Sequence, residues 1–508
     1  MSHHDADVIV IVVGAGNAAF CAALSAQEAG AKVLMLEAAP EEESGGNSRF
    51  TAGSIRVVYN GIEDIKTLVP DLTPAEIDNT DFGSYTAAQF FDDMARVTQA
   101  RADPDLVELL VTRSFATLNW LRDKGVRFIP IYGRQAFKID GKFKFWGGLT
   151  VESVGGGPGL VAMLTHAAQK RGVAIRYRTR ALDLLYDGGR IEGVRVREDG
   201  TPRELRANAV VLACGGFEAN PEWRTRYLGP GWDLAKVRGS RFNTGEGIRM
   251  AIDIGAAPRG NWSGCHAVGW DRGAPEFGDL AVGDGFQKHS YPLGVMINAN
   301  GARFVDEGAD FRNYTYAKYG RVVLEQPGQF AWQIFDRKVK HLLRDEYNIR
   351  QVTKVAANSI EDFAQKLEGV NAAEFLKTVK EWNAAVRTDG PFNPNVKDGR
   401  CTQGLAVDKS NWAHTLDAPP FEGYAVTCGV TFTFGGLRIN SAAAVLNTDY
   451  IAIRGLYAAG ELVGGLFYFN YPGGTGLMSG AVFGMIAGAS AARDARADAN
   501  CTSVTANE

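Results

Sequence analysis

The chain has 508 residues, enough for two or three domains, and its 54 basic and 58 acidic side chains give a net charge of −4. This near balance disfavours a nucleic-acid or anionic-membrane surface, which requires clustered Lys and Arg. The six cysteines form no CxxC spacing, which argues against an iron–sulfur cluster, a c-type haem or a disulfide scaffold. The 60 glycines indicate many tight turns and close approaches of the backbone to a ligand.

Two uncharged stretches are long enough to be considered as membrane spans or a signal peptide. Residues 8–27 follow histidines and aspartates rather than the basic residues of a signal peptide, and two glycines interrupt them. Residues 462–492 contain eight glycines and a proline, and such backbone irregularity is poorly tolerated in lipid. We therefore expect two buried segments of a cytoplasmic protein with no transmembrane segment.

The chain opens with a βαβ unit. A β-branched run over 8–13 predicts a buried parallel strand, an alanine-rich helix follows to about residue 29, and the next strand covers 32–36. The turn after the first strand reads GxGxxA, in which glycines let the backbone and the helix N-terminus approach a pyrophosphate. Glu37 lies 21 residues past Gly16, where a carboxylate accepts ribose hydroxyls and disfavours NADP.

Glycine-rich loops recur far along the chain, at 45–53, 458–461 and 472–477. A long cofactor with two ends explains three separated loops better than NAD does, so FAD is the expected cofactor. The alternative for each loop is a glycine turn that only connects packed elements. The expected cofactor-binding residues are Gly14, Gly16, Asn17, Ala18, Glu37, Asn47, Ser48, Thr51, Gly53, Gly215, Glu246, Glu461, Gly476 and Leu477.

The α/β alternation returns after residue 160 and again after 415, whereas the segment between has a different character. Predicted elements are a helix at 160–171, strands at 174–178, 182–186, 191–196 and 209–213, a hairpin of 295–298 with 302–305 around Asn300-Gly301, and helices at 359–367 and 373–386. The predicted fold class is α/β. A Rossmann-like FAD-binding domain (1–265 and 415–508) is interrupted by an inserted α+β capping, or substrate, domain at 266–414.

Six short segments occur in this order: GGNSRFTAG (45–53), VVLACGGF (210–217), NTGEG (243–247), NGARFVDE (300–307), TFGGLRIN (433–440) and GLYAAGE (455–461). Together with Glu37 they resemble the fumarate reductase/succinate dehydrogenase flavoprotein superfamily over about residues 8–490. Three further segments, GCHAVGW (264–270), EGADFRNYTYAKYG (307–320) and LFYFNYPGGTGL (466–477), resemble the bacterial tricarballylate dehydrogenase family.

This resemblance implies an FAD-dependent dehydrogenase acting on a CH–CH bond. Its expected reaction converts tricarballylate to cis-aconitate by hydride transfer to flavin N5, and the electrons pass to a separate, membrane-associated acceptor protein. Some members attach FAD through a histidine near the first glycines, but no histidine lies between residues 4 and 166. The flavin is therefore expected to be noncovalent.

The resemblance also implies catalytic residues. Arg312 is the nearest match to the arginine that transfers the proton in fumarate-reducing members, one residue beyond the family spacing, and His266 resembles a substrate-binding histidine. Thr431 stands where the family has a histidine, and Tyr471 stands where it has a carboxylate-clamping arginine. These departures disfavour fumarate and succinate. Tyr471 also resembles the tyrosine that holds the substrate carbonyl in ketosteroid dehydrogenases.

The chemistry adds requirements of its own. Removing a proton next to a carboxylate requires cations that stabilise enolate-like charge, and bidentate arginines suit a polycarboxylate. The candidates are Arg49, Arg312 and Arg241, each of which has a solvated surface charge as its alternative. Because arginine stays protonated, it is a natural acid and an awkward base. The base could instead be His266, His289, Tyr291 or Tyr314.

The predicted catalytic residues are thus Arg312, His266 and Tyr471, and the predicted substrate-binding residues are Arg49, Thr431 and His289. A packed structural histidine is the alternative for His266, and an aromatic packing residue is the alternative for Tyr471. Other functions that remain open are a flavoenzyme like the 3-ketosteroid dehydrogenases or the fumarate reductases, and a flavin-binding subunit without turnover.

Overall fold

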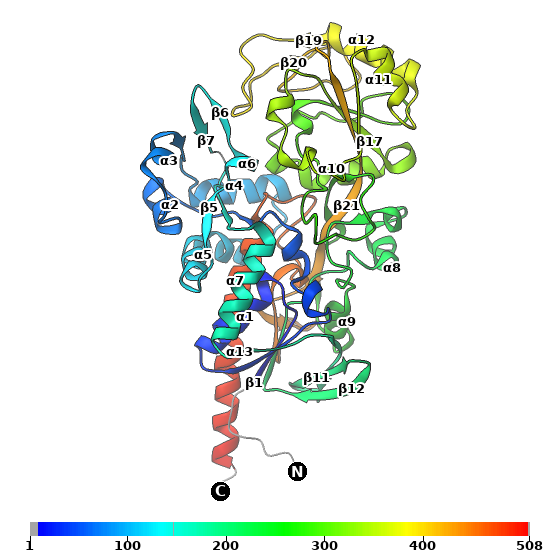
Figure 1. The fold of residues 1–508 in the computed structure, drawn as a ribbon. Helices are drawn as coiled ribbons and strands as arrows, with labels where there is room; N and C mark the ends of the chain where they lie inside the picture. Colours follow the sequence, from blue (N-terminus) through cyan, green and yellow to red (C-terminus); the bar gives the residue numbers. More distant parts are fainter. Residues whose placement is uncertain (1–8, 146, 506–508) are drawn as a thin grey trace.

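The computed structural model describes residues 9–145 and 147–505, with side chains to Ala497. Val8, the first residue of the predicted first strand, and the histidines and aspartates ahead of it lie outside the described residues. The elements form two stacked domains and a small helical lobe (Figure 1). We call the domain around β1 the base and the domain around β17 and β21 the cap.

The base is built on a six-stranded sheet with the order β22–β23–β13–β1–β2–β9. Every neighbouring pair is parallel except β22 with β23. The first four predicted strands of this sheet are confirmed, and β1 is buried along four of its five residues, as a central parallel strand must be. The strands are β1 (Ile9–Val13), β2 (Lys32–Leu36), β9 (Ala174–Arg176), β13 (Ala209–Leu212), β22 (Ala444–Leu446) and β23 (Ala452–Ala458).

Different layers cover the two faces of this sheet. Three helices pack on one another beside it, α1 (Asn17–Glu28), α7 (Gly156–Lys170) and α13 (Thr475–Thr505), while an antiparallel sheet of β10 (Thr179–Tyr186), β11 (Ile191–Glu198) and β12 (Thr201–Arg206) contacts β2, β13 and β23. The resulting mixed α/β architecture agrees with the predicted fold class. Both described ends of the chain lie at the foot of the base (Figure 1).

Helix α13 is long and apolar enough to cross a membrane by length and composition, yet 72% of its most apolar window is buried inside the protein. It packs lengthwise on α1, and glycines make the close approach possible. A Cβ atom on Gly488 would lie 2.1 Å from the carbonyl oxygen of Ala22, and one on Gly484 would lie 2.5 Å from that of Ala18. The helix is therefore a core element of the base in this structure.

The lobe beside the base comes from residues 54–153. Its helices are α2 (Ile62–Leu68), α3 (Pro74–Asp78), α4 (Ala87–Thr98), α5 (Pro104–Asp123) and α6 (Tyr132–Gln135). Two small sheets complete it, one of β3 (Ser54–Ile55), β8 (Val151–Ser153) and β5 (Phe128–Pro130), and one of β4 (Thr80–Asp81), β7 (Lys142–Lys144) and β6 (Phe137–Ile139). Sequence analysis assigned no elements to this region.

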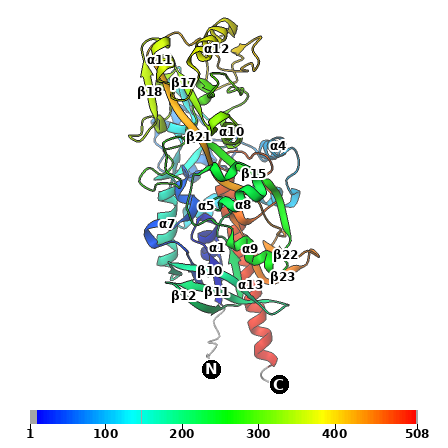
Figure 2. The same cartoon turned by 90° about the vertical axis from the view of Figure 1, so that its right-hand side faces the viewer.

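The cap is built on a second sheet. Its strands are β14 (Lys236–Val237), β15 (Pro258–Asp271), β16 (Val295–Ile297), β17 (Ala331–Phe335), β18 (Lys354–Ala357) and β21 (Phe421–Leu437), and its helices are α10 (Tyr316–Leu324), α11 (Ile360–Lys366) and α12 (Ala372–Ala385). The paired strands β15 and β21 run from the cap toward the base (Figure 2). This sheet therefore uses strands on both sides of the 266–414 segment.

The predicted hairpin around Asn300-Gly301 forms but is short. Asn298 N–H donates to the Ala302 carbonyl (3.0 Å) and Ile297 forms an antiparallel bridge with Arg303, while β16 pairs along its length with β17. The reason is Glu307, whose carboxylate accepts from Met296 N–H (2.7 Å) and pairs with Arg303 (2.5 Å). This side chain occupies the backbone donor that strand pairing would use. By contrast, the predicted helices α7, α11 and α12 are confirmed to within a few residues.

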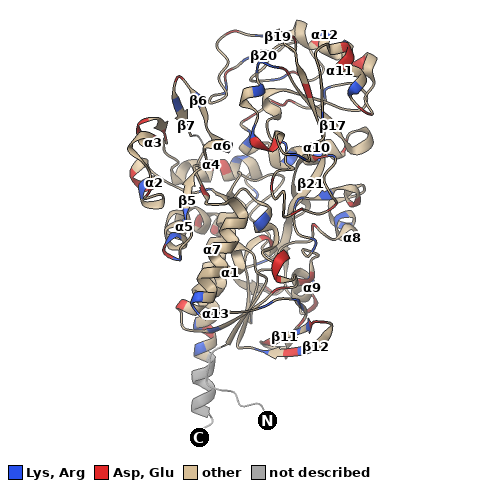
Figure 3. Ribbon diagram, viewed as in Figure 1, with Lys and Arg blue, Asp and Glu red and all other residues tan. Residues whose placement is uncertain are grey.

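Basic and acidic residues are interspersed along the described part of the chain (Figure 3). Charge therefore has to be considered locally, in the cavity between the base and the cap.

Candidate active site

A long cavity runs from the glycine turn after β1 to the junction of base, lobe and cap. We call the part around Gly14–Ala18, Glu37, Asn47 and Ser48 the cofactor end. The part around His266, His289, Arg312, Tyr316 and Tyr471 is the reaction end.

The cofactor end begins at a glycine turn, where the backbone lines the cavity without side chains. Gly14 has φ +116°, and a Cβ there would lie 2.3 Å from the carbonyl oxygen of Ala213, so no other residue fits. Gly16 is the N-cap residue of α1 and has no side chain to cap the first turn, in which the N–H of Asn17 donates to Ser48 Oγ. The helix N-terminus therefore presents free N–H groups and a partial positive charge to the cavity.

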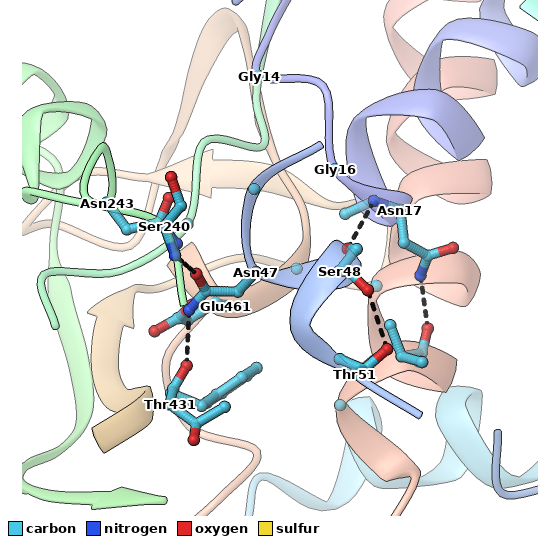
Figure 4. Close-up of a pocket in the computed structure, with 18 of the residues that line it drawn as sticks. Gly14, Gly16, Asn17, Asn47, Ser48, Thr51, Ser240, Asn243, Thr431 and Glu461 are labelled. Atoms are coloured by element: carbon cyan, nitrogen blue, oxygen red, sulfur yellow. Dashed lines mark hydrogen bonds between the residues drawn. The ribbon is translucent and has the colours of Figure 1, made fainter. Parts of the chain in front are cut away.

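Hydrogen bonds between distant segments hold this end together (Figure 4). Asn17 N–H donates to Ser48 Oγ (3.0 Å), and the Asn17 amide donates to the Leu477 carbonyl (2.8 Å). Asn47 reaches across the cavity, because its amide donates to the Thr431 carbonyl (2.8 Å) and accepts from Ser240 N–H (2.8 Å). The predicted loops at 45–53 and 472–477 thus meet at α1.

Two buried carboxyls, Glu37 and Glu461, line the cavity, and Glu218 lies next to Glu461. Glu37 accepts from Ala39 N–H (2.8 Å), and burial raises its pKa above the ordinary value. Glu461 accepts from Thr433 N–H (2.7 Å), and burial together with the neighbouring Glu218 raises its pKa well above the ordinary value. Burial also raises the pKa of Glu218. Repulsion between these two adjacent buried carboxyls opposes their ionising together.

Aromatic rings cluster beside Arg312 at the reaction end. The Tyr316 and Tyr471 hydroxyls are hydrogen-bonded (2.7 Å), and the ring of His266 lies 4.9 Å from Tyr316 and 4.8 Å from Tyr471, centre to centre. Arg312 Nη1 lies 3.2 Å from His289 Nδ1. Because a guanidinium only donates, His289 accepts at Nδ1 and carries its proton on Nε2, which has no partner within the protein.

Burial sets the charges in this cluster. It lowers the pKa of His266 well below the ordinary value, with nearby Arg238 adding to the effect, and it lowers that of His289 likewise, with Arg312 adding to it. Both imidazoles are therefore neutral at pH 7. Burial also lowers the pKa of Arg312, which makes its guanidinium a better acid than an exposed one.

Three arginines form what we call the cationic wall of the reaction end: Arg134, Arg238 and Arg312. Arg238 donates to Asp284 Oδ1 (2.8 and 2.5 Å), Arg134 donates to Asp284 Oδ2 (2.7 Å), and Arg312 donates to the Arg134 carbonyl (2.6 Å). Asp284 is the carboxylate among the described residues that line this end. Two further carboxyls, Glu346 and Glu152, act on Arg134 from outside the lining, and the buried Arg344 acts on it with the opposite sign. The wall therefore has an excess of positive charge.

Most predicted site residues line this cavity. They are Gly14, Gly16, Asn17, Ala18, Glu37, Asn47, Ser48, Thr51, Gly215, Glu246, His266, His289, Arg312, Thr431, Glu461, Tyr471, Gly476 and Leu477. Gly53 lies between two lining residues but does not line the cavity itself; a Cβ there would meet Ser153 Oγ at 2.2 Å. Its glycine serves packing between the base loop and β8.

Four arginine and tyrosine candidates lie elsewhere. The prediction for Arg49 is corrected, because the turn at 46–50 points its guanidinium back to the carbonyls of Glu42 (2.8 Å) and Ser44 (3.1 Å). Arg241 pairs with Glu43 (2.9 Å) at the surface. The Tyr291 hydroxyl is bonded to Thr315 Oγ1 (2.6 Å), and Tyr314 donates to Asp93 (2.7 Å). None of the four lines the cavity.

Sequence reasoning missed five cavity residues: Arg134, Arg238, Asp284, Asn313 and Tyr316. Asn313 is 1% exposed, and neither atom of its amide has a partner within the protein. The one feature of the sequence that could have identified Asn313 is its place directly after Arg312, and Tyr316 follows three residues later. Arg134 and Arg238 lie in segments that carry no motif.

Known proteins resemble this chain over nearly its whole length. A family model described as an FAD binding domain matches residues 9–477. The probable fumarate reductase Ifc3 of Shewanella frigidimarina is 29% identical over 498 residues, which cover 96% of this chain and 75% of that protein. The 3-oxosteroid 1-dehydrogenase of Mycobacterium tuberculosis is 27% identical over 435 residues, which cover 79% and 74% respectively.

A solved structure shows the same likeness. The open conformation of a flavocytochrome c3 fumarate reductase matches with a TM-score of 0.70 and 27% identity, covering 96% of this chain and 78% of that one. The match extends over base, lobe and cap together.

Proposed function

Since the chain belongs to the FAD binding domain family, within the fumarate reductase/succinate dehydrogenase flavoprotein superfamily, we propose that it dehydrogenates a small polycarboxylate. The chain is an FAD-dependent oxidoreductase of the class that acts on CH–CH bonds. The proposed reaction is tricarballylate to cis-aconitate, in which a hydride leaves one carbon, a proton leaves its neighbour and a C=C bond forms.

The cofactor end fits FAD. The side-chain-free turn at Gly14 and the uncapped N-terminus of α1 would hold the diphosphate, and Glu37 would accept the ribose hydroxyls. The loop at Asn47–Ser48 and the start of α13 at Gly476–Leu477 extend the cavity toward the reaction end. FAD, when bound, accepts the hydride. The other steps belong to side chains of this chain.

The single observation that carries the substrate class is the cationic wall. Three guanidiniums and one carboxylate, Asp284, line this end of the cavity, where partial burial makes charge attraction stronger than at the surface. A polycarboxylate supplies the missing negative charges and can accept bidentate hydrogen bonds from planar guanidiniums. A neutral ligand would leave that excess charge uncompensated.

The reacting proton is assigned to Arg312, which must be in its neutral form to accept that proton in the dehydrogenating direction. It lies at the reaction end, its position is fixed by His289 and by the Arg134 carbonyl, and burial lowers its pKa. The His289 Nε2–H and the Asn313 amide have no partner within the protein and would bind substrate carboxylates. The Tyr316–Tyr471 pair would donate a hydrogen bond to a substrate oxygen.

A second candidate is oxidation of a ketosteroid. The hydroxyl pair of Tyr316 and Tyr471 favours it, because two linked phenols suit one carbonyl oxygen, and a 3-oxosteroid 1-dehydrogenase is among the similar proteins. The cationic wall argues against it, since a steroid brings no charge to compensate Arg238 and Arg312. A fumarate-reductase-like function is the third reading, favoured by the likeness to Ifc3.

We also propose that the enzyme acts in the cytoplasm and passes its electrons to a separate, membrane-associated acceptor protein. The sequence supports this route because its six cysteines do not form the clusters that bind a redox relay. The acceptor is therefore expected to supply that relay.

The deciding experiment is anaerobic titration of the oxidised holoenzyme, with flavin absorbance as the signal. Bleaching by tricarballylate and formation of cis-aconitate are expected. Bleaching by a 3-ketosteroid alone would replace the proposal with the second candidate. If neither compound bleaches the flavin and fumarate reoxidises the reduced enzyme, the chain is a reductase; if nothing exchanges electrons with it, it is a binding subunit.

A further inference from the structure

Arg56 is a fully buried cation beside the reaction end that sequence analysis did not single out. It is 0% exposed, follows β3, and its Nε donates to the Gly473 carbonyl (2.8 Å), while Nη1 donates to the Gly147 carbonyl. Its guanidinium faces the rings of Tyr85 (5.1 Å) and Tyr314 (5.5 Å). Nη2 has no partner within the protein.

Asp93 on α4 completes a network around Arg56. Its Oδ2 lies 3.6 Å from Arg56 Nη1 and accepts from the hydroxyls of both Tyr85 and Tyr314 (2.7 Å each). Burial raises the pKa of Tyr314 to about 12, so this hydroxyl stays protonated and donates. Tyr85 belongs to the lobe, whereas Tyr314 belongs to the cap, and the two phenols therefore approach one carboxylate from two parts of the molecule.

Further bonds tie this network to the residues of the reaction end. The Asn470 amide donates to the Tyr314 carbonyl (2.7 Å), and Gly473 N–H donates to the Asn313 carbonyl (3.0 Å). At the surface, Arg96 on α4 pairs with Asp310 (2.7 Å) and lies over the Tyr314 ring (4.5 Å). The cap segment 310–316 and the loop 470–474 are thus bonded to each other and to the lobe.

We propose that Arg56 and Asp93 are positioning residues that hold the cap segment 310–316 against the loop 470–474. They thereby fix the positions of Arg312, Tyr316 and Tyr471 relative to one another. The inference rests on the proposed function only in taking these three residues as the reaction site. It does not depend on which carboxylate is the substrate.

The nature of the network favours positioning over bulk stability. A buried cation costs desolvation energy, and apolar replacements of buried ion pairs are often no less stable. Arg56 has no close bidentate carboxylate and leaves Nη2 without a partner, so its burial is not repaid by an ideal pair. What it supplies is directional hydrogen bonding to two loop carbonyls, which fixes geometry.

Two matched variants test the proposal. Tyr314→Phe and Tyr85→Phe each remove one hydroxyl that donates to the same Asp93 oxygen at the same distance, but only Tyr314 lies in the cap segment. Both should retain FAD and lose similar thermal stability. Tyr314→Phe should lower kcat about tenfold with little change in KM, the size expected for one lost hydrogen bond to a charged group, while Tyr85→Phe should keep kcat within about twofold.

Hydrogen exchange of the holoenzyme gives a readout that needs no substrate. Amides in 310–316 and 468–474 should exchange faster in Tyr314→Phe than in Tyr85→Phe, with the rest of the cap unchanged. Equal kcat losses in the two variants, or equal exchange in these segments, would overturn the positioning role. If the wild-type enzyme turns over no polycarboxylate, the proposed function fails, and the exchange data still decide the role of the network.

Discussion

The two ends of the cavity are built in different ways. The cofactor end is made mainly of backbone: turns without side chains, a helix N-terminus and amides that bond across loops. The reaction end is made of side chains from six separated segments, at 134, 238, 266, 289, 312–316 and 471. Backbone geometry leaves a local mark in a sequence, whereas a constellation of side chains depends on how the domains meet.

The largest expected effect comes from removing the arginine of the reaction end. Arg312→Ala should keep full flavin content and lose turnover by roughly 10²–10⁴, because a positioned group that transfers the reacting proton contributes about that much. Arg312→Lys should also be poor, since it retains charge but not the planar fork that contacts His289 and the Arg134 carbonyl. Steady-state rates per bound flavin provide the measurement.

Arg241→Ala is the matched control for this change. Arg241 is exposed and pairs with Glu43 outside the cavity, so its loss should leave the rate per flavin unchanged. Near-normal turnover of Arg312→Ala would remove this residue from the mechanism, and loss of flavin in that variant would break the separation between the two ends.

A substitution at the cofactor end should have the opposite effect, weakening flavin binding while sparing the chemistry. Glu37→Arg should weaken FAD binding by about one to two decades, the cost of losing a charge-assisted hydrogen bond. Enzyme reloaded with FAD at saturating concentration should recover most of its rate, because Glu37 lies away from the cationic wall. Flavin released by acid denaturation, which a noncovalent cofactor allows, gives the bound fraction.

Glu42→Arg supplies the control, because Glu42 is a nearby carboxylate with a largely exposed side chain that does not line the cavity. Unchanged FAD affinity in Glu37→Arg would contradict the assignment of the ribose contact. Flavin that stays on the acid-denatured chain would contradict noncovalent binding.

The contrast between the ends explains how far the sequence could predict the structure. Gly14, Gly16 and Glu37 were predictable because a close backbone approach demands glycine at fixed spacing from a carboxylate. Arg134 and Arg238 were not, because an arginine that lines a cavity has the same local sequence as one at the surface. Arg49 and Arg312 were both candidates from the sequence. In the structure Arg312 donates to the Arg134 carbonyl in the cavity, whereas Arg49 donates to a carbonyl at the surface.

The same limit applies to the fold. The βαβ opening was predicted because strand, turn and helix are contiguous. The hairpin at Asn300-Gly301 was predicted to be longer than it is. The side chain of Glu307, six residues beyond Gly301 and paired with Arg303, accepts from Met296 N–H and ends the pairing. Long-range competition of this kind has no signature in local periodicity.

The smallest expected effect concerns Tyr471, where hydrogen bonding and packing must be separated. Tyr471 is 8% exposed, and its ring lies 5.4 Å from that of Phe467 and nearly parallel to that of Phe432, so its aromatic body is part of the core. Its hydroxyl is hydrogen-bonded to that of Tyr316 and is the group available to a substrate. Tyr471→Phe keeps the body and removes the hydroxyl.

Tyr471→Phe should therefore slow turnover by about two- to tenfold, as expected for a neutral hydrogen bond worth ~0.5–1.5 kcal/mol, while the flavin spectrum stays unchanged. Tyr468→Phe, three residues earlier in the same loop and outside the cavity lining, should leave the rate unaltered. A wild-type rate for Tyr471→Phe would mean that the phenol only packs, and the substrate anchor would then lie with the cationic wall. If Tyr471→Phe slows turnover and adding Tyr316→Phe slows it no further, the two hydroxyls act as one functional pair.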